Sequence, residues 1–188
     1  MKKLLLIIVI LMFALPTLAD SDKATIADFK KSDQVKKFFD TAYGYAIFPS
    51  VGKGGFGIGG SYGEGSVYKQ GTKTGTVTLT QVTIGFQLGG QAFSEIIFFK
   101  DKASYYTFTN GNFEFSAQAS AIAINAGANA QTSTTGTSAG AGTTPDNNKQ
   151  EGVYQNGMAT FTYLKGGLMY EAALGGQKFS FEALEKKD

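Results

Sequence analysis

The stretch that decides the fold runs from Phe48 to Gly65 and reads FPSVGKGGFGIGGSYGEG. Its glycines at 55, 57 and 59 alternate with Phe56 and Ile58, the period of two that is typical of a strand. One face of such a strand is bare backbone, which allows sharp coiling or the close approach of another element. The sequence predicts that this strand is entered through a turn at Pro49 and left through a turn at Gly63–Gly65.

The segment Gly55–Gly60 also fits G-x-G-x-x-G, the fingerprint of a dinucleotide site. That fingerprint requires a strand before it, a helix that opens inside it, and an acidic residue about 20 positions further on. No helical period follows Gly60, and the next segments alternate like strands. The motif therefore does not predict a nucleotide site.

The first 19 residues have the pattern of a signal peptide. Two lysines follow Met1, an apolar run extends from Leu4 to Leu15, and Pro16–Ala19 supplies the small residues of a cleavage site. The run is shorter than the ~18–20 residues that a membrane-spanning helix needs. We expect cleavage before Asp20, and export to the periplasm or the medium. Residues 20–188 then form a single domain.

Composition limits the possible functions. Without the two lysines of residues 1–19, fifteen lysines balance fifteen carboxylates, and the chain has no arginine. Arginine is the residue best suited to reading bases and phosphates, so a nucleic-acid partner is not expected. The chain also lacks histidine, cysteine and tryptophan, which removes the usual catalytic triads and most zinc sites. We expect no enzyme activity, no metal and no cofactor.

Two short helices are predicted near the N-terminus. The first covers Asp22–Lys31, with Ser21 or Asp22 as its N-cap, and the second is capped by Ser32. In the second, an apolar stripe recurs at helical spacing: Val35, Phe38, Phe39 and Ala42. The lysines off this stripe could contact an anionic membrane surface. A helix packed on the protein core with a charged outer face explains the same pattern and is the preferred interpretation.

The rest of the chain reads as strands. We expect a hairpin turn at Gly71–Gly75, a strand buried on both faces within Ala92–Lys100, and one or two helical turns capped by Asp101. Further strands are predicted at Phe113–Ala123, Met158–Leu164, Gly167–Leu174 and Lys178–Phe181. The fold class is therefore mainly β, a strongly curved antiparallel sheet or closed β-barrel with one or two short N-terminal helices on it or in one end. Residues 131–150 are of low complexity and predict a flexible loop.

Several blocks of the sequence resemble the SYLF domain family. The resemblance begins in Tyr43–Pro49 and Gly52–Gly65 and continues in Gly85–Gln91, Phe98–Lys100 and Ala159–Leu168. The blocks occur in the same order as in the family and extend over about residues 25–182. Such a set is far more specific than any single motif.

The resemblance implies lipid binding, with phosphoinositides as ligands of the eukaryotic members and an actin role in some of them. The predicted export departs from this setting, because neither actin nor phosphoinositides are expected outside a bacterial cytoplasm. The lipobox cysteine of the lipoprotein relatives is also missing. The expected partner is therefore an anionic phospholipid or membrane surface, and actin is not expected.

The residues suggest where a phospholipid headgroup could bind. Backbone N–H groups around Gly54 and Gly55 could form an anion-binding nest, and Lys53 could add a point charge. The helix lysines could face the same headgroup: Lys30, Lys31, Lys36 and Lys37. The glycines fit strand coiling equally well. The alternative function is a structural or protein-interaction module of the cell envelope without a specific lipid ligand.

Overall fold

The computed structural model describes residues 18–56, 58–84, 89–116, 122–124, 154–164 and 176–185. Its helices are α1 (Leu18–Phe29), α2 (Asp33–Thr41) and α3 (Lys102–Thr109). Its strands are β1 (Gly44–Phe56), β2 (Ile58–Lys69), β3 (Thr72–Ile84), β4 (Gly89–Phe99), β5 (Asn112–Glu114), β6 (Ile122–Ile124), β7 (Met158–Leu164) and β8 (Lys178–Ala183). The prediction of a mainly β fold with two short N-terminal helices is confirmed.

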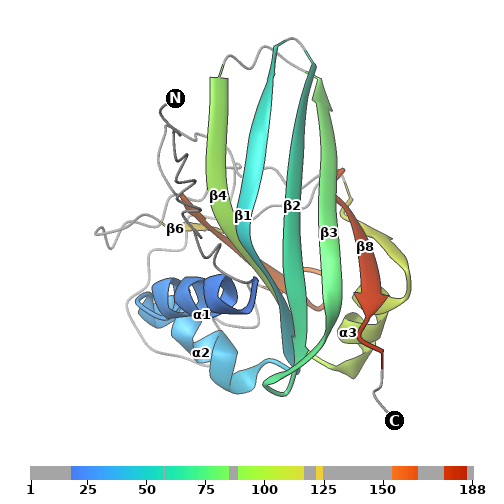
Figure 1. The fold of residues 1–188 in the computed structure, drawn as a ribbon. Coiled ribbons are helices and arrows are strands. Elements are labelled where there is room, and N and C mark those ends of the chain that lie inside the picture. The colour runs from blue at the N-terminus through green and yellow to red at the C-terminus, as the bar shows by residue number, and fades with distance from the viewer. Residues whose placement is uncertain are drawn as a thin grey trace, which may run out of the picture.

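The strands form one sheet in the order β5-β8-β3-β2-β1-β4-β7-β6, and only the β6–β7 pair is parallel. The sheet curls into a half-barrel (Figure 1). Met158 on β7 and Phe179 on β8 lie in the same hydrophobic cluster, although four strands separate them in the sheet. In a flat sheet those two strands would be about 24 Å apart, at the usual spacing between neighbours. The expected strong curvature is thus confirmed.

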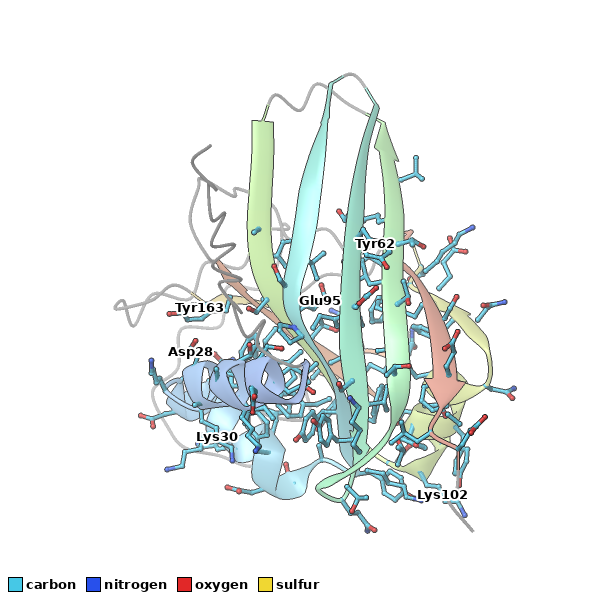
Figure 2. The ribbon with its side chains drawn as sticks, in the orientation of Figure 1. Asp28, Lys30, Tyr62, Glu95, Lys102 and Tyr163 are labelled. Carbon is cyan, nitrogen blue, oxygen red and sulfur yellow. The ribbon has the colours of Figure 1, made fainter. Side chains whose placement is uncertain are left out.

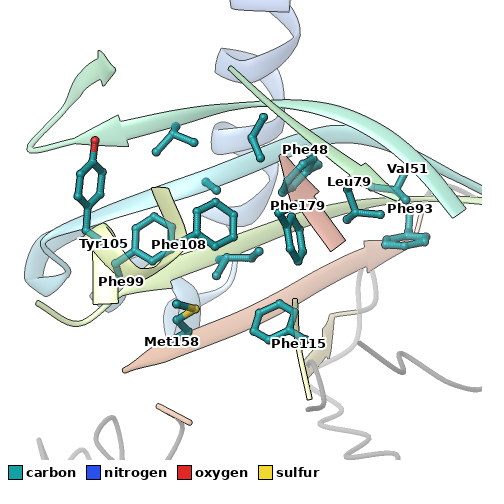
Figure 3. Close-up of a cluster of buried hydrophobic side chains, with 14 residues drawn as sticks. Phe48, Val51, Leu79, Phe93, Phe99, Tyr105, Phe108, Phe115, Met158 and Phe179 are labelled. Atoms are coloured by element: carbon teal, nitrogen blue, oxygen red, sulfur yellow. The ribbon is translucent and has the colours of Figure 1, made fainter. Parts of the chain in front are cut away.

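The concave side of the sheet encloses the larger cluster, here called the inner core (Figure 3). Tyr105 and Phe108 of α3 close the end of this cluster that is lower in Figure 1, so α3 takes the position that the N-terminal helices could have occupied. Val51 and Leu79 are fully buried further up. The interior at these levels is therefore filled by side chains. The full set is Ala46, Phe48, Val51, Val67, Val77, Leu79, Phe93, Ile97, Phe99, Tyr105, Phe108, Phe115, Met158 and Phe179.

The convex side carries the second cluster, the outer core, in which α1 and α2 pack on the sheet. Phe29, Val35 and Phe38 are buried there against Phe98 and Phe161. The ring of Phe38 lies 5.0 Å from that of Phe161 and 5.3 Å from that of Phe98, centroid to centroid. The interpretation of the second helix as a packed one is therefore confirmed.

Helix α1 begins at Leu18, four residues before the predicted start at Asp22. Asp22 therefore lies within the helix and not at its start. Its side chain is fully buried, and the hydroxyl of Tyr68 on β2 donates a 2.8 Å hydrogen bond to its Oδ2. The carboxylate thus fastens α1 to the sheet and does not cap the helix.

Pro49 does not end the first strand as predicted. Strand β1 continues through it to Phe56, and the register slips between Phe48 and Val51 toward β4, which marks a β-bulge. A bulge is one of the few places in a sheet where proline fits, because its missing N–H is not needed in the ladder. The hydroxyl of Ser94 on β4 donates a 2.8 Å hydrogen bond to the carbonyl of Pro49 and ties the bulge to the next strand.

The predicted turn at Gly63–Gly65 is also wrong, because these residues lie inside β2. A Cβ on Gly65 would collide with the carbonyl oxygen of Ile47 and come within 2.7 Å of the Phe48 ring. A Cβ on Gly63 would come within 2.8 Å of Val51. The two glycines therefore leave room for the bulge of β1 and do not turn the chain.

The tight turns lie elsewhere. Gly55 of β1 pairs with Gly59 of β2 across a hairpin, so the glycines at 55 and 59 belong to two strands and not to one. Gln70 and Gly71, with φ of 49° and 80°, form the two-residue turn between β2 and β3. Positive φ at both positions matches the twist of a hairpin. The turn predicted at 71–75 is thus shorter, and Gly75 already belongs to β3.

The predicted long strand at Phe113–Ala123 is replaced by two short ones. Strand β5 pairs with β8 at one edge of the sheet, and β6 pairs with β7 at the other. The strands predicted at Ala92–Lys100, Met158–Leu164 and Lys178–Phe181 are confirmed, and Asp101 caps α3 through Ser104. Residues 1–17, 131–150 and 167–174 lie outside the described residues.

The bulge offers a test of the fold. Gly65→Ala should lower the free energy of unfolding by about 1–3 kcal/mol, the usual cost of overpacking, because its Cβ meets backbone and a buried ring. Gly52→Ala is the matched control in the same hairpin, since the nearest atom to its Cβ would be 4.0 Å away. We expect a change within about 0.5 kcal/mol there. Urea unfolding measures both, and equal effects would contradict the assignment.

Candidate functional site

Lys53 lies on the concave side of the sheet, in its upper half. It pairs with Ser61 on β2 and Gln91 on β4. Val51, two residues away along β1, points into the inner core, and side chains two apart share a face. Lys53 is half-buried. The lysine of the opening stretch is therefore placed above the inner core.

The row that contains Lys53 is polar. Ser61 and Gln81 are buried beside it, and the hydroxyl of Ser61 donates a 3.2 Å hydrogen bond to Oε1 of Gln81. The row below is apolar and includes Val51, Leu79 and Phe93, which belong to the inner core. A polar layer with one cation thus lies directly on top of the packed interior.

Above Lys53, glycines face one another on three neighbouring strands. Gly54 pairs with Gly60 and Gly90, and Gly55 pairs with Gly59 and Gly89. On β1, β2 and β4 both faces of the sheet are bare at these two levels. The Gly-Gly pairs at 54–55, 59–60 and 89–90 are therefore neighbours in space.

This arrangement does not form the expected anion-binding nest. Gly54 and Gly55 are paired with strands on both sides, so the ladders occupy their backbone groups. A nest needs neighbouring residues of alternating right- and left-handed backbone. Among the described glycines, the left-handed region holds Gly71, Gly111, Gly157 and Gly176. The glycines of this site shape the sheet, and Lys53 alone offers an anion a full positive charge.

The lysines of the helices form a separate group. Lys30, Lys31, Lys36 and Lys37 are all exposed. A 2.7 Å hydrogen bond to Asp28 raises the pKa of Lys31, and the ammonium of Lys30 lies 4.9 Å from the centre of the Phe39 ring.

The structure does not bring these lysines together with Lys53. Helix α2 leads into the lower end of β1 at Gly44, and Figure 2 shows Lys30 at that lower end. Lys53 lies nine positions further along β1, about 30 Å at the usual rise of a strand. One headgroup cannot contact both groups, so the expectation of a shared site is not supported.

The interior holds a carboxyl group that the sequence analysis did not single out. Glu95 on β4 is fully buried, and Nε2 of Gln177 donates a 3.2 Å hydrogen bond to its Oε2 (Figure 2). Burial raises the pKa of Glu95 to about 8, and the bond to Gln177 acts in the opposite direction. The sequence signal was present, because Glu95 is the one charged residue inside an apolar run.

Among the described residues, three buried oxygens of this carboxyl and its neighbours have no hydrogen-bond partner: Glu95 Oε1, Thr162 Oγ1 and Gln177 Oε1. Thr162 lies directly opposite Glu95 in the ladder between β4 and β7. A protonated Glu95 places a donor among these oxygens, whereas an ionised one adds only a further acceptor. The neutral acid therefore suits this interior better than the carboxylate.

Neither a metal site nor a membrane-spanning helix emerges from the described part of the chain. No three His, Cys, Asp or Glu side chains gather there in a way that could hold a metal ion. No helix there is both long and apolar enough to cross a bilayer.

The geometry defines a class of domain, a curled and mostly antiparallel sheet with helices on its convex side and one cation above its core. A family model for Ysc84, described as Las17-binding protein actin regulator, matches residues 80–186, more than half of the chain. The chain therefore belongs to this family, that of the SYLF domain, and the resemblance is confirmed. The match runs from the last part of β3 through β8 and begins after the opening stretch. No curated protein matches the chain.

The buried carboxyl predicts a pH dependence of stability. Between pH 4.5 and about 8 the folded chain keeps the Glu95 proton while the unfolded chain loses it, so stability falls as pH rises through this window. The slope from this group is at most about 1.4 kcal/mol per pH unit. Below the window both states are protonated, and the slope vanishes.

Glu95→Gln keeps the size and the amide-like hydrogen bonding but cannot ionise. We expect this variant to lose most of the decline between pH 5 and 8 and to exceed the parent in stability at pH 9. Glu64→Gln, at an exposed position of β2, should keep the slope of the parent. Urea unfolding at a series of pH values measures all three. An unchanged slope in Glu95→Gln would refute the assignment.

Proposed function

We propose that this protein is a non-enzymatic lipid-binding protein of the cell envelope, which recognises the headgroups of anionic phospholipids. Membership in the SYLF family supports lipid binding or protein interaction as the broad function. The signal-peptide pattern of residues 1–19 supports export to the periplasm or the medium. No arginine-rich surface favours nucleic acid, and export makes an actin role unsuitable for this chain.

One observation carries the choice of a headgroup site. Lys53 is the only charged residue in the upper part of strands β1 to β4, since Gly54–Gly63 and Thr74–Ser94 contain none. An unbalanced cation on a half-buried, otherwise neutral surface attracts anions with little competition from neighbouring carboxylates. A lysine near an anionic membrane contributes roughly 1 kcal/mol. Lys53 is therefore the proposed contact to the phosphate, and the bare strands around Gly54 and Gly55 leave it accessible.

The helix surface is the weaker candidate for the same function. Five lysines and five aspartates occur between Asp20 and Ala42, so the formal net charge of this segment is zero. The exposed lysines Lys30, Lys31, Lys36 and Lys37 alternate with Asp28, Asp33 and Asp40, which oppose the attraction of an anionic surface. We propose that these lysines have a secondary role at most.

The proposed interaction involves the headgroup and not an enclosed acyl chain. Val51, Leu79 and Phe93, directly below the Lys53 row, are buried and packed. Interiors at native density leave no room for a further hydrocarbon chain without rearrangement. The protein is thus proposed to bind at a membrane surface and not to extract lipid.

Flotation of the mature protein with lipid vesicles tests this function. We expect binding to vesicles rich in anionic phospholipid, weak binding to neutral phosphatidylcholine vesicles, and loss of binding at high salt, because screening shortens the reach of the charges. If no vesicle is bound under any condition, the protein-interaction alternative of the family description takes its place.

Variants locate the site. Lys53→Ala should weaken binding to anionic vesicles about fivefold, the equivalent of roughly 1 kcal/mol. The double variant Lys36→Ala/Lys37→Ala should bind almost like the parent. Lys102→Ala, at an exposed position of α3, controls for the general loss of one charge. A stronger effect of the helix variant than of Lys53→Ala would move the site to α2.

A further inference from the structure

Four strands extend beyond the rest of the sheet. The ladder between β4 and β7 ends at Phe93, and that between β3 and β8 ends at Thr80. Above these positions β4, β1, β2 and β3 stand alone in the part of the chain that the structure describes (Figure 1). Four residues of β3, Gln81–Ile84, lie above this level, which is about 13 Å at the usual rise. We call this projection the sheet tip.

The sheet tip is uncharged apart from Lys53 at its base. The opposite end of the same strands differs, because the turn between β2 and β3 is flanked by Lys69 and Lys73, and α3 begins with Lys102. The four long strands therefore have one charged and one neutral end. The neutral end can leave water at a lower desolvation cost than the charged end.

The convex face of the sheet tip is smooth and carries exposed apolar side chains. Gly54 and Gly90 are exposed there, and in the same row Val82 is 76% exposed. Tyr62, opposite Thr80 at the base of the tip, is 54% exposed, and its hydroxyl donates a 2.7 Å hydrogen bond to Glu64 (Figure 2). These two are half of the large hydrophobic residues that are exposed in the described chain. The others are Tyr106 and Leu184.

We propose that the sheet tip enters the headgroup layer of the bilayer, with Val82 in the interface and Lys53 at the level of the phosphates. This inference rests on the proposed function and adds the orientation of the protein on the membrane. The height of about 13 Å slightly exceeds the ~5–10 Å to which interfacial elements are buried. The base of the tip therefore remains at the surface, where Lys53 lies.

The unpaired backbone groups of the sheet tip limit how deeply the tip can enter the bilayer. In the sheet tip, β3 and β4 are edge strands within the described residues, so their outward N–H and C=O groups need water or headgroups as partners. Unpaired backbone groups are too costly in the hydrocarbon core. The tip consequently stops in the headgroup layer and does not span the membrane.

The absence of tryptophan allows a direct test of orientation. Val82→Trp and Tyr106→Trp place a single tryptophan on the sheet tip and on α3, both at exposed positions. With anionic vesicles, we expect the Val82→Trp emission to shift to shorter wavelength and to be quenched by brominated acyl chains. The Tyr106→Trp emission should stay unchanged. Both proteins should float with the vesicles.

A charge at the tip gives a second readout. Val82→Asp should weaken binding to anionic vesicles about tenfold, the loss expected when one buried valine no longer contributes. Leu184→Asp, at a position 49% exposed near the C-terminal end, should bind like the parent. Circular dichroism confirms that both variants are folded.

The outcomes separate the two proposals. If the parent floats but Val82→Trp and Tyr106→Trp respond alike, the orientation is wrong and headgroup binding stands. If the parent floats and Tyr106→Trp alone is quenched, the opposite end faces the membrane and the inference is overturned. If the parent binds no vesicle, the proposed function and this inference fail together.

Discussion

The bulge at Pro49 is the constraint on which the rest of the structure depends. In a regular strand, every second side chain points to the same face of the sheet. Ala46 and Phe48 point into the inner core, and so does Val51, which is possible because the bulge inserts one residue between them. Every side chain above the bulge is thereby moved to the other face. Without it, Lys53 would lie on the convex side.

The bulge also explains the composition of the neighbouring strand. It brings the backbone of Ile47 and the ring of Phe48 so close to β2 that only glycine fits at position 65. The glycines of the opening stretch therefore serve different purposes. Those at 63 and 65 accommodate the bulge, and those at 54, 55, 59 and 60 lie side by side in the sheet tip. The glycine-rich pattern of this stretch therefore has two structural causes, the bulge of β1 and the close pairing of strands in the sheet tip.

The apolar patterns predicted much of the fold. The stripe of α2, the doubly buried strand β4 and the capping residue Asp101 could be read because each depends on local spacing. The bulge at Pro49, the division of 113–124 between two edges, and the location of Gly63–Gly65 inside a strand could not. Each of these depends on which strands become neighbours, and that information is not local. Taken locally, proline and glycine indicate turns, which is their commonest structural role.

The candidate site was predictable in part for the same reason. Lys53 stood out because it is the one lysine among the glycines, whereas its distance from Lys36 and Lys37 follows from the length of β1. The importance of Glu95 became visible only in three dimensions, since its partner Gln177 is 82 residues away. A carboxyl inside an apolar run is a signal worth following whenever no partner can be named nearby.

The pairing of β8 with β3 has a consequence for the order in which the chain folds. Strands β1 to β3 are joined by consecutive hairpins, and β4 pairs with β1, so all four can form from a continuous segment. The concave side closes only when β8 reaches β3, where Leu79 pairs with Phe179, a hundred positions along the chain. Until then Phe48, Leu79 and Phe93 have no cover from Phe179 and its neighbours. Because the chain is synthesised from its N-terminus, the apolar side chains of β1 to β4 stay exposed for most of the synthesis. The pairing of the C-terminal strand β8 with β3 covers them last and thereby protects the chain from aggregation.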